Sequence, residues 1–376
     1  MVQYQLILIY IFYFCIIAVH SSPTEASGTD FNSWTTKAWG ANLGNWLVLE
    51  RWMNPSFFEK YAPHAKDEWT FSQQAPNASQ LLKDHWDHWI TEQDFKQLSI
   101  AKANHVRIPV GYWAFLKPNA SEPYVSSGQK QQIERILSYC KKYKIYAILD
   151  LHGLPGSQNG NDHSGRIGKI EFYSQHNRER SLVALQAMVD WMNGLDNDIK
   201  SRISAIESAN EPHVGSKEEL ALLKDYYQKA YKIISTSRYK VPMMFHDGFQ
   251  GLDAWSGFLS SSANAIIDLH SYYAFPPEKD ETNILKSICG IKRSAKAFHL
   301  PVFFGEWSLA SGVNTTDRWL KKMMDTQISA YKNGGAGGTM WSIKNMIHSP
   351  EWSFELLQNS NIITNTTFSS YSTAAC

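Results

Sequence analysis

Eight short apolar runs recur along the chain, separated by longer amphipathic stretches. They lie at residues 38–45, 105–110, 146–152, 203–211, 241–247, 265–272, 301–307 and 337–344. Because they are apolar throughout rather than at alternate positions, they are typical of strands buried on both faces of a parallel sheet. Helical periodicity marks residues 129–143, 180–192, 217–234 and 317–334 between them. Eight such alternations predict an α/β fold, a single-domain (β/α)₈ TIM barrel.

Length and composition fit one large domain. The 376 residues are 43% hydrophobic, which is enough to bury a large core. We find no internal repeat beyond the strand–helix unit and no change in composition that would mark a second domain. We therefore expect a signal peptide at 1–22, a polar leader at 23–33 and the barrel at 34–376. The net charge of +1 and the lack of a basic stripe argue against a nucleic-acid partner.

The N-terminus has the pattern of a secretory signal. Residues 6–19 are apolar, and Ser21 and Ser22 follow as small residues near a cleavage site. A run of about 14 residues is too short to cross a bilayer. No Lys or Arg precedes it, so a signal anchor remains the alternative. We expect a secreted monomer that has no contact with the membrane once the signal peptide is cleaved.

Secretion favours paired cysteines. Once Cys15 leaves with the signal, three remain. Cys140 lies late in a predicted amphipathic helix and is expected to be a buried free thiol, so we predict a disulfide between Cys289 and Cys376. Four N-x-S/T sequons are candidate glycosylation sites: Asn77, Asn119, Asn314 and Asn365.

Polar residues close most of the apolar runs. They are Arg107, His152, Asn210, Glu211, His246, Asp247, His270, Glu306 and Lys344. In TIM barrels the chemistry lies at the C-terminal ends of the strands. Glu211 in NEP and Glu306 in GEW are about 95 residues apart and end the fourth and seventh runs. A retaining glycosidase needs two such carboxyl groups about 5 to 5.5 Å apart.

Other motifs favour ordinary structural roles. His85 and His88 share one helix face, and we expect that face to be solvated rather than to bind a metal. The glycines at 334–338 predict a tight turn into the eighth strand, since no Lys-Ser/Thr follows as in a phosphate-binding loop. We therefore expect neither a metal nor a cofactor.

Seven segments together resemble the exo-β-1,3-glucanase branch of glycoside hydrolase family 5, in order from about Trp39 to the C-terminus. They are GANLGNWLVLERWMNPSFFE, HVRIPVGYWAF, LDLHGLPGSQNG, NEP, DLHSYYAF, GEWS and MWSIKN. The resemblance implies a retaining, metal-independent TIM-barrel enzyme with Glu211 as the acid/base and Glu306 as the nucleophile. It also implies a glucose pocket formed by Glu50, Arg107, His152, Asn210, His270, Tyr272 and Trp341, with Phe275 at the entrance.

The chain departs from the family pattern in three places. Asn161 stands where relatives often carry an aromatic residue that forms an entrance clamp with the residue matching Phe275. Gly44-Asn45 replaces a glycine pair, and Ile343 replaces the second tryptophan of the eighth strand. These changes leave the chemistry intact but affect the outer sugar subsites.

The resulting expectation is release of glucose from the nonreducing end of β-1,3-glucan. A β-1,6-glucanase, a small-glucoside β-glucosidase and a noncatalytic sugar-binding protein are the alternatives. We expect Arg107 to keep Glu306 ionised, because a neighbouring cation favours the carboxylate. We also expect the negative charge of Glu306 to keep Glu211 protonated.

Overall fold

The computed structural model describes residues 28–29, 31, 34 and 36–376. The expected signal peptide and Cys15 lie outside the described residues. Eight parallel strands form a closed barrel in chain order, from β1 beside β2 round to β8 beside β1, as the sequence predicts. The strands are β1 (Ala38–Asn42), β2 (His105–Gly111), β3 (Tyr146–Gly153), β4 (Ile203–Glu207), β5 (Met243–His246), β6 (Ala265–Ser271), β7 (Val302–Trp307) and β8 (Gly337–Met340).

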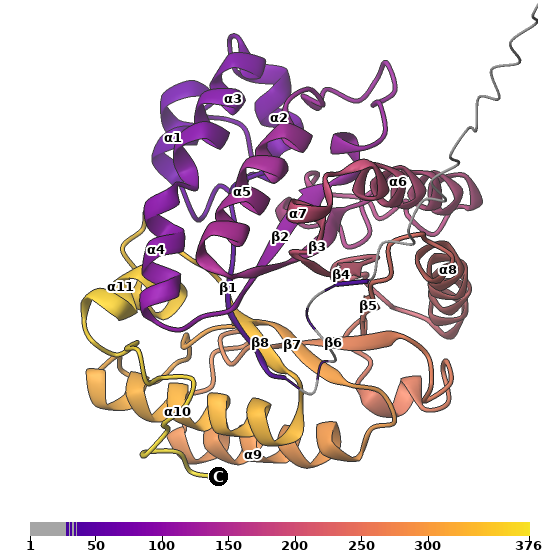
Figure 1. Ribbon diagram of the computed structural model, residues 1–376. Coiled ribbons are helices and arrows are strands. Elements are labelled where there is room, and N and C mark those ends of the chain that lie inside the picture. The colour runs from indigo at the N-terminus through magenta and orange to yellow at the C-terminus, as the bar shows by residue number, and fades with distance from the viewer. Residues whose placement is uncertain (1–27, 30, 32–33, 35) are drawn as a thin grey trace, which may run out of the picture.

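Helices surround this barrel (Figure 1). They are α1 (Pro55–Tyr61), α2 (Glu68–Gln74), α3 (Ala78–Trp89), α4 (Glu92–Ile100), α5 (Gln129–Tyr143), α6 (Gln175–Gly194), α7 (Asn197–Lys200), α8 (Lys217–Ser235), α9 (Glu281–Ala297), α10 (Asp317–Gly334) and α11 (Phe354–Asn359). The predicted bounds of α5 and α10 are confirmed, because both helices carry an uninterrupted apolar stripe that packs on the barrel.

One crossover differs from the predicted alternation. Between β5 and β6 the described chain forms only a four-residue 3₁₀ helix, η3 (Leu252–Trp255), instead of an α-helix. The buried rings of Trp255 and Phe258 pack against Phe245 of β5, with centroid distances of 5.3 and 5.4 Å. These aromatic side chains cover the strand where a longer helix would otherwise lie.

Several strands are also shorter than their apolar runs, β4 and β8 among them. β4 ends at Glu207 and β8 at Met340, before the polar residues Glu211 and Lys344 that close the two runs. Beyond β4 the backbone still bonds to both neighbouring strands, with Ser208 N donating to Met244 O at 3.0 Å and Asn210 N to Leu151 O at 3.2 Å. The segment therefore stays buried without forming a regular ladder.

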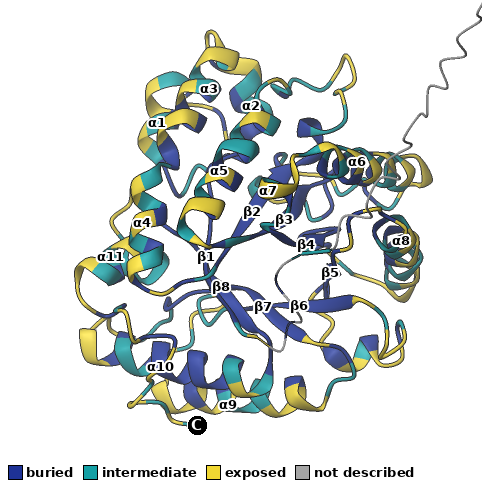
Figure 2. Ribbon diagram, in the orientation of Figure 1, coloured by how far each residue is buried: buried dark blue, intermediate teal, exposed yellow. Residues whose placement is uncertain are grey.

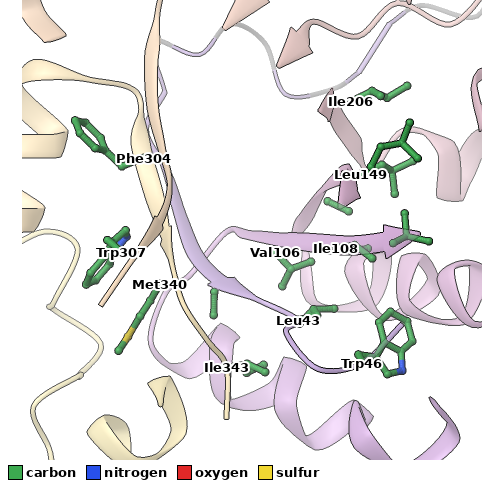
Figure 3. Close-up of a cluster of buried hydrophobic side chains, with 14 of the residues drawn as sticks. Leu43, Trp46, Val106, Ile108, Leu149, Ile206, Phe304, Trp307, Met340 and Ile343 are labelled. Carbon is green, nitrogen blue, oxygen red and sulfur yellow. The ribbon is translucent and has the colours of Figure 1, made fainter. Parts of the chain in front are cut away.

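The core has an outer and an inner part. The larger cluster lies between strands and helices, where Val106, Leu149 and Ile206 project from three successive strands (Figure 3). All the strands are buried (Figure 2). Burial of each large aliphatic side chain contributes about 1.5 to 3 kcal/mol. The sheet is therefore fixed on both faces, as its continuous apolar runs predict.

The inner cluster closes the barrel at the N-terminal ends of its strands. Ile148, Met244 and Phe303 project inward there, and the rings of Phe31 and Trp34 pack over them. Phe31 is only 6% exposed, although the sequence analysis assigned it to a polar leader. The packed domain thus includes this residue.

A disulfide joins Cys289 of α9 to Cys376, and Cys140 is a buried free thiol, as predicted. The four sequon asparagines are exposed. Among the described residues, we find no helix with the length and apolar character needed to span a membrane.

Candidate active site

The largest described cavity, about 1080 Å³, opens at the C-terminal ends of the strands. Nine residues named from the sequence line it: Glu50, His152, Asn161, Glu211, His270, Tyr272, Phe275, Glu306 and Trp341. A smaller hollow of about 490 Å³ lies at the opposite end of the barrel, near Trp34 and His299. No described carboxylate lines that hollow, so the acid chemistry belongs to the larger cavity.

Glu306 and Glu211 approach each other across this cavity. Glu306 is near the end of β7, whereas Glu211 lies beyond β4 with a left-handed φ of 44°. Such a conformation is strained for a residue with a side chain and is typical of functional sites. His270 Nδ1 is 2.5 Å from Glu211 Oε1 and 3.5 Å from Glu306 Oε2. These two carboxylate oxygens are therefore at most about 6 Å apart, which fits the retaining geometry.

Glu306 is held from several sides. Arg107 Nη1 donates to its Oε1 at 2.9 Å, and the Tyr272 hydroxyl donates to its Oε2 at 2.8 Å. The preceding residue must be glycine, because a Cβ on Gly305 would lie 2.0 Å from the Asp268 carboxylate. The nucleophile candidate is thus fixed in place before any substrate binds.

Arg107 lies beneath the cavity and does not line it. Its side chain is fully buried and reaches Asp150 at 3.1 Å, Glu207 at 2.7 Å and Glu306 at 2.9 Å. Burial opposes the charged form, but the charges of Asp150, Glu207 and Glu306 raise the pKa of Arg107 well above its ordinary value. The guanidinium therefore stays charged and supports Glu306 rather than a sugar.

Asn210 is a second residue that the sequence placed in the pocket and the structure places behind it. Its Oδ1 accepts a hydrogen bond from Arg107 Nη2 at 2.7 Å, and its Nδ2 is 3.4 Å from His152 Nε2. His152 in turn lies 2.6 Å from Asp150 Oδ2 and stacks on Trp341 at 5.5 Å. Asn210 thus orients the histidine that lines the cavity.

The expectation that Glu211 stays protonated is wrong for this structure. Burial raises the pKa of Glu211, but the hydrogen bond and charge of His270 outweigh burial and lower it below its ordinary range. Correspondingly, the pKa of His270 is raised well above its ordinary value despite burial, first by Glu306 and Asp268. The pair shares one proton, which lies on the imidazole because three carboxylates surround it.

Lys344 and His85 also differ from expectation. Lys344 lies beyond β8 and pairs with Asp94 at 3.0 Å, away from the cavity. His85 is buried rather than solvated, and its Nε2 contacts Asn45 O at 2.7 Å. Burial lowers the pKa of His85 to about 4. Of the two histidines, only His88 is exposed.

Several further residues line the cavity that no sequence pattern indicated. They are Trp52, Asp162, His163, Phe249, Ile347, Glu351 and Trp352. The ring centroid of Trp352 lies 6.0 Å from that of Phe275 and 5.4 Å from that of Tyr272, so these rings form one aromatic wall. Asp162 and His163 lie in the loop after β3. Trp352 gave no local signal.

Glu211, His246 and His270 are close enough together to suggest a metal site. However, His246 Nδ1 accepts a hydrogen bond from Gly248 N at 2.9 Å, so its proton lies on Nε2. Neither nitrogen of His246 is then a free ligand. The hydrogen bond between His270 Nδ1 and Glu211 Oε1 occupies the other two ligand atoms of the group. These three residues therefore fit acid–base chemistry better than metal binding.

Known proteins share both the sequence and the fold. The model of the cellulase family (glycosyl hydrolase family 5) matches residues 65–346. A "probable glucan 1,3-beta-glucosidase A" of Emericella nidulans is 36% identical over 72% of this chain and 67% of its own length. A "glucan 1,3-beta-glucosidase" of Yarrowia lipolytica is 30% identical over 90% of this chain and 91% of its own.

Two solved structures illustrate the fold. A rutinosidase from Aspergillus niger superposes with a TM-score of 0.82 at 22% identity, covering 88% of this chain and 99% of that one. An endoglucanase from Thermotoga maritima superposes with a TM-score of 0.57 at 14% identity, covering 88% and 95%. The barrel, the carboxylate pair at its C-terminal end and the match over residues 65–346 agree with one another. The chain belongs to glycosyl hydrolase family 5.

Proposed function

We propose that this protein is a retaining exo-glycosidase that releases glucose from the nonreducing end of β-1,3-glucan. The observation that carries the proposal is the carboxylate pair bridged by His270 Nδ1, at 2.5 Å from Glu211 and 3.5 Å from Glu306. This spacing suits direct attack by one carboxylate and leaves less room for the intervening water of an inverting enzyme. The names of the relatives from Emericella nidulans and Yarrowia lipolytica support the substrate.

In the first step, Glu306 attacks the anomeric carbon while the bond to the leaving oxygen breaks. His270 Nδ1 passes the shared proton to Glu211 along their 2.5 Å contact, and Glu211 gives it to that oxygen. As Glu306 becomes an ester it loses the negative charge that supports the imidazolium, which favours this transfer. In the second step, Glu211 takes a proton from water, which attacks the same carbon and restores Glu306.

Sugar contacts follow from the lining residues. Burial, with the charge of Asp162, raises the pKa of Glu50 well above its ordinary value, which favours the neutral acid, a form that can donate to a sugar hydroxyl. Trp341 and His152 stack together and offer a flat apolar face to a pyranose ring. The aromatic wall runs from Tyr272, which donates to Glu306, out to the exposed ring of Phe275, and its outer part suits a second sugar.

The signal-like N-terminus, the disulfide and the exposed sequons Asn77, Asn119, Asn314 and Asn365 support a secreted glycoprotein. We further propose that it acts as a monomer on cell-wall or free glucan.

Substrate class is tested by comparing laminarin, pustulan and aryl β-glucosides with product analysis. Glucose as the only early product from laminarin would support exo action, whereas a ladder of oligomers would rule it out. Faster hydrolysis of pustulan would favour a β-1,6-glucanase, and activity on aryl glucosides alone a β-glucosidase. No hydrolysis of any of them, together with sugar binding, would favour a noncatalytic protein.

The two glutamates are tested separately. Glu306→Ala cannot form the glycosyl-enzyme and should be inactive on every substrate. Glu211→Ala should lose about 10² to 10⁴ in rate where the leaving group needs a proton. A dinitrophenyl glucoside needs none, so it should load this variant and then stall. Azide should rescue Glu211→Ala with β-glucosyl azide as product, and Glu306→Ala only with the α product. Exchanged products would reverse the two roles.

A further inference from the structure

Both oxygens of Glu211 face an imidazole. His270 Nδ1 contacts Oε1 at 2.5 Å, and the reaction scheme above uses this contact. His163 Nε2 lies 3.5 Å from the other oxygen, Oε2, and has no part in that scheme. Its side chain is 19% exposed and lines the cavity, so it lies on the side of Glu211 from which substrate and water arrive.

The loop that carries His163 is anchored to the body of the protein. The residue lies in the 3₁₀ helix η2 (Asp162–Ser164), which follows β3. Trp69 N donates to Gly165 O at 3.0 Å, and Ile167 N donates to Asp67 Oδ2 at 2.6 Å. These two bonds hold the residues that follow η2, so the imidazole is kept beside Glu211.

Neighbouring hydrogen bonds define the tautomer of His163. Arg107 Nη2 donates to Asn210 Oδ1 at 2.7 Å, so the amide must turn its Nδ2 away from the arginine. That Nδ2 lies 3.5 Å from His163 Nδ1, which therefore accepts. The proton of a neutral His163 is then on Nε2, the atom that faces Glu211 Oε2.

The other groups around His163 agree with a donor role. His152 lies at a ring-centroid distance of 5.5 Å, and the carboxylate of Asp162 accepts from the His163 backbone N at 3.0 Å. His152 is neutral because burial lowers its pKa well below the ordinary value. Glu211 is thus the anionic acceptor that the Nε2–H of His163 faces.

We propose that His163 is a positioning residue for Glu211, which orients Oε2 toward the glycosidic oxygen and stabilises the carboxylate left after proton transfer. The proposal rests on the proposed function. His163 keeps its own proton throughout. In the first step Glu211 passes its proton to the leaving oxygen and Nε2–H bonds to the resulting anion. In the second step the same bond holds the carboxylate as it accepts the proton of water. Contacts of this kind tighten when substrate binds.

The test compares His163→Ala and His163→Gln with wild type on a β-1,3-glucan oligomer and on dinitrophenyl β-glucoside. A hydrogen bond to a charged group justifies about a tenfold loss of kcat/KM for His163→Ala on the oligomer. The dinitrophenyl glucoside needs no acid in the first step, so its kcat/KM should change less than about threefold. Glutamine keeps an N–H donor and should restore part of the loss.

The pH profile separates positioning from a structural role. Loss of a donor to the carboxylate raises the pKa of Glu211, so the basic limb of kcat/KM should move to higher pH in His163→Ala. His176→Ala, an exposed change on α6, is the surface control and should behave like wild type in kinetics and thermal unfolding.

Two outcomes overturn the proposal alone, given an active wild type. Equal losses on both substrates with an unshifted basic limb would indicate a structural effect, and unchanged kinetics would show that His163 has no role. A wild-type protein that hydrolyses neither substrate would instead refute the proposed function, and this inference with it.

Discussion

Removal of the buried cation beneath the active site should destabilise the protein strongly. Arg107 is fully buried and contacts three carboxylates, those of Asp150, Glu207 and Glu306, at 3.1, 2.7 and 2.9 Å. The variant Arg107→Met keeps most of the side-chain volume but leaves these groups without their cation. Loss of one partner of a buried ion pair costs about 3 to 5 kcal/mol. From the unfolding entropy typical of a chain of this size, that corresponds to roughly 4 to 7 °C in Tm.

The loss should also depend on pH. Burial raises the pKa of Asp150 to about 7 and that of Glu207 well above its ordinary value even with Arg107 present, which lowers both. Without Arg107 these pKa values rise further, so the folded variant holds protons that the unfolded chain releases above about pH 4. Stability of the variant should then fall as pH rises, and the difference from wild type should be larger at pH 8 than at pH 5.

Thermal unfolding of both proteins at these two pH values measures the effect. Arg135→Met is the matched control, because Arg135 donates to the carbonyls of Ile90 and Trp86 and, within the described part of the chain, pairs with no carboxylate. This control should lose only about 1 to 2 kcal/mol in the free energy of unfolding, and the loss should not depend on pH. If Arg107→Met lost less than about 1 kcal/mol at both pH values, the carboxylates would not need the cation and the reasoning would fail.

Two further changes test separate parts of the structure. Asn161→Phe adds an aromatic ring to the cavity wall, where it would form an entrance clamp with Phe275. Stacking worth about 1 kcal/mol should lower KM for laminarin oligomers roughly fivefold. A KM that rises or stays constant would place residue 161 away from the second sugar. Glu68 is buried and accepts a hydrogen bond from Leu49 N at 2.9 Å, and burial raises its pKa to about 8. The folded protein therefore keeps a proton that the unfolded chain loses, so the free energy of unfolding falls as pH rises from about 4 to 8. Glu68→Gln does not titrate, and denaturant unfolding should show it gaining a few kcal/mol relative to wild type between pH 5 and 8; parallel pH profiles would contradict this.

The sequence by itself determined the barrel and placed the carboxylates Glu211 and Glu306 together at its large cavity. Continuous apolar runs can only be satisfied by strands covered on both faces, and this requirement is local to each run. Polar residues that end most of these runs are then carried toward the same end of the barrel by the shared direction of the strands. Glu211, His270 and Glu306 could therefore be grouped from their positions at the ends of these runs alone. The pairing of Cys289 with Cys376 followed similarly, since Cys140 lies on the buried face of a helix.

Tertiary structure alone decided what each of these residues does for its neighbours. Arg107 and Asn210 lie behind the cavity, where Arg107 pairs with carboxylates from three other strands and donates to Asn210 Oδ1. The proton shared by Glu211 and His270 depends on the charge of Glu306 from β7 and on the charges of Asp268 and the imidazole, both from β6. His163 and Trp352 enter the site on loops whose courses no periodicity describes. Sequence patterns report the burial of one element at a time, whereas protonation, orientation and the shape of the pocket arise from contacts among several elements.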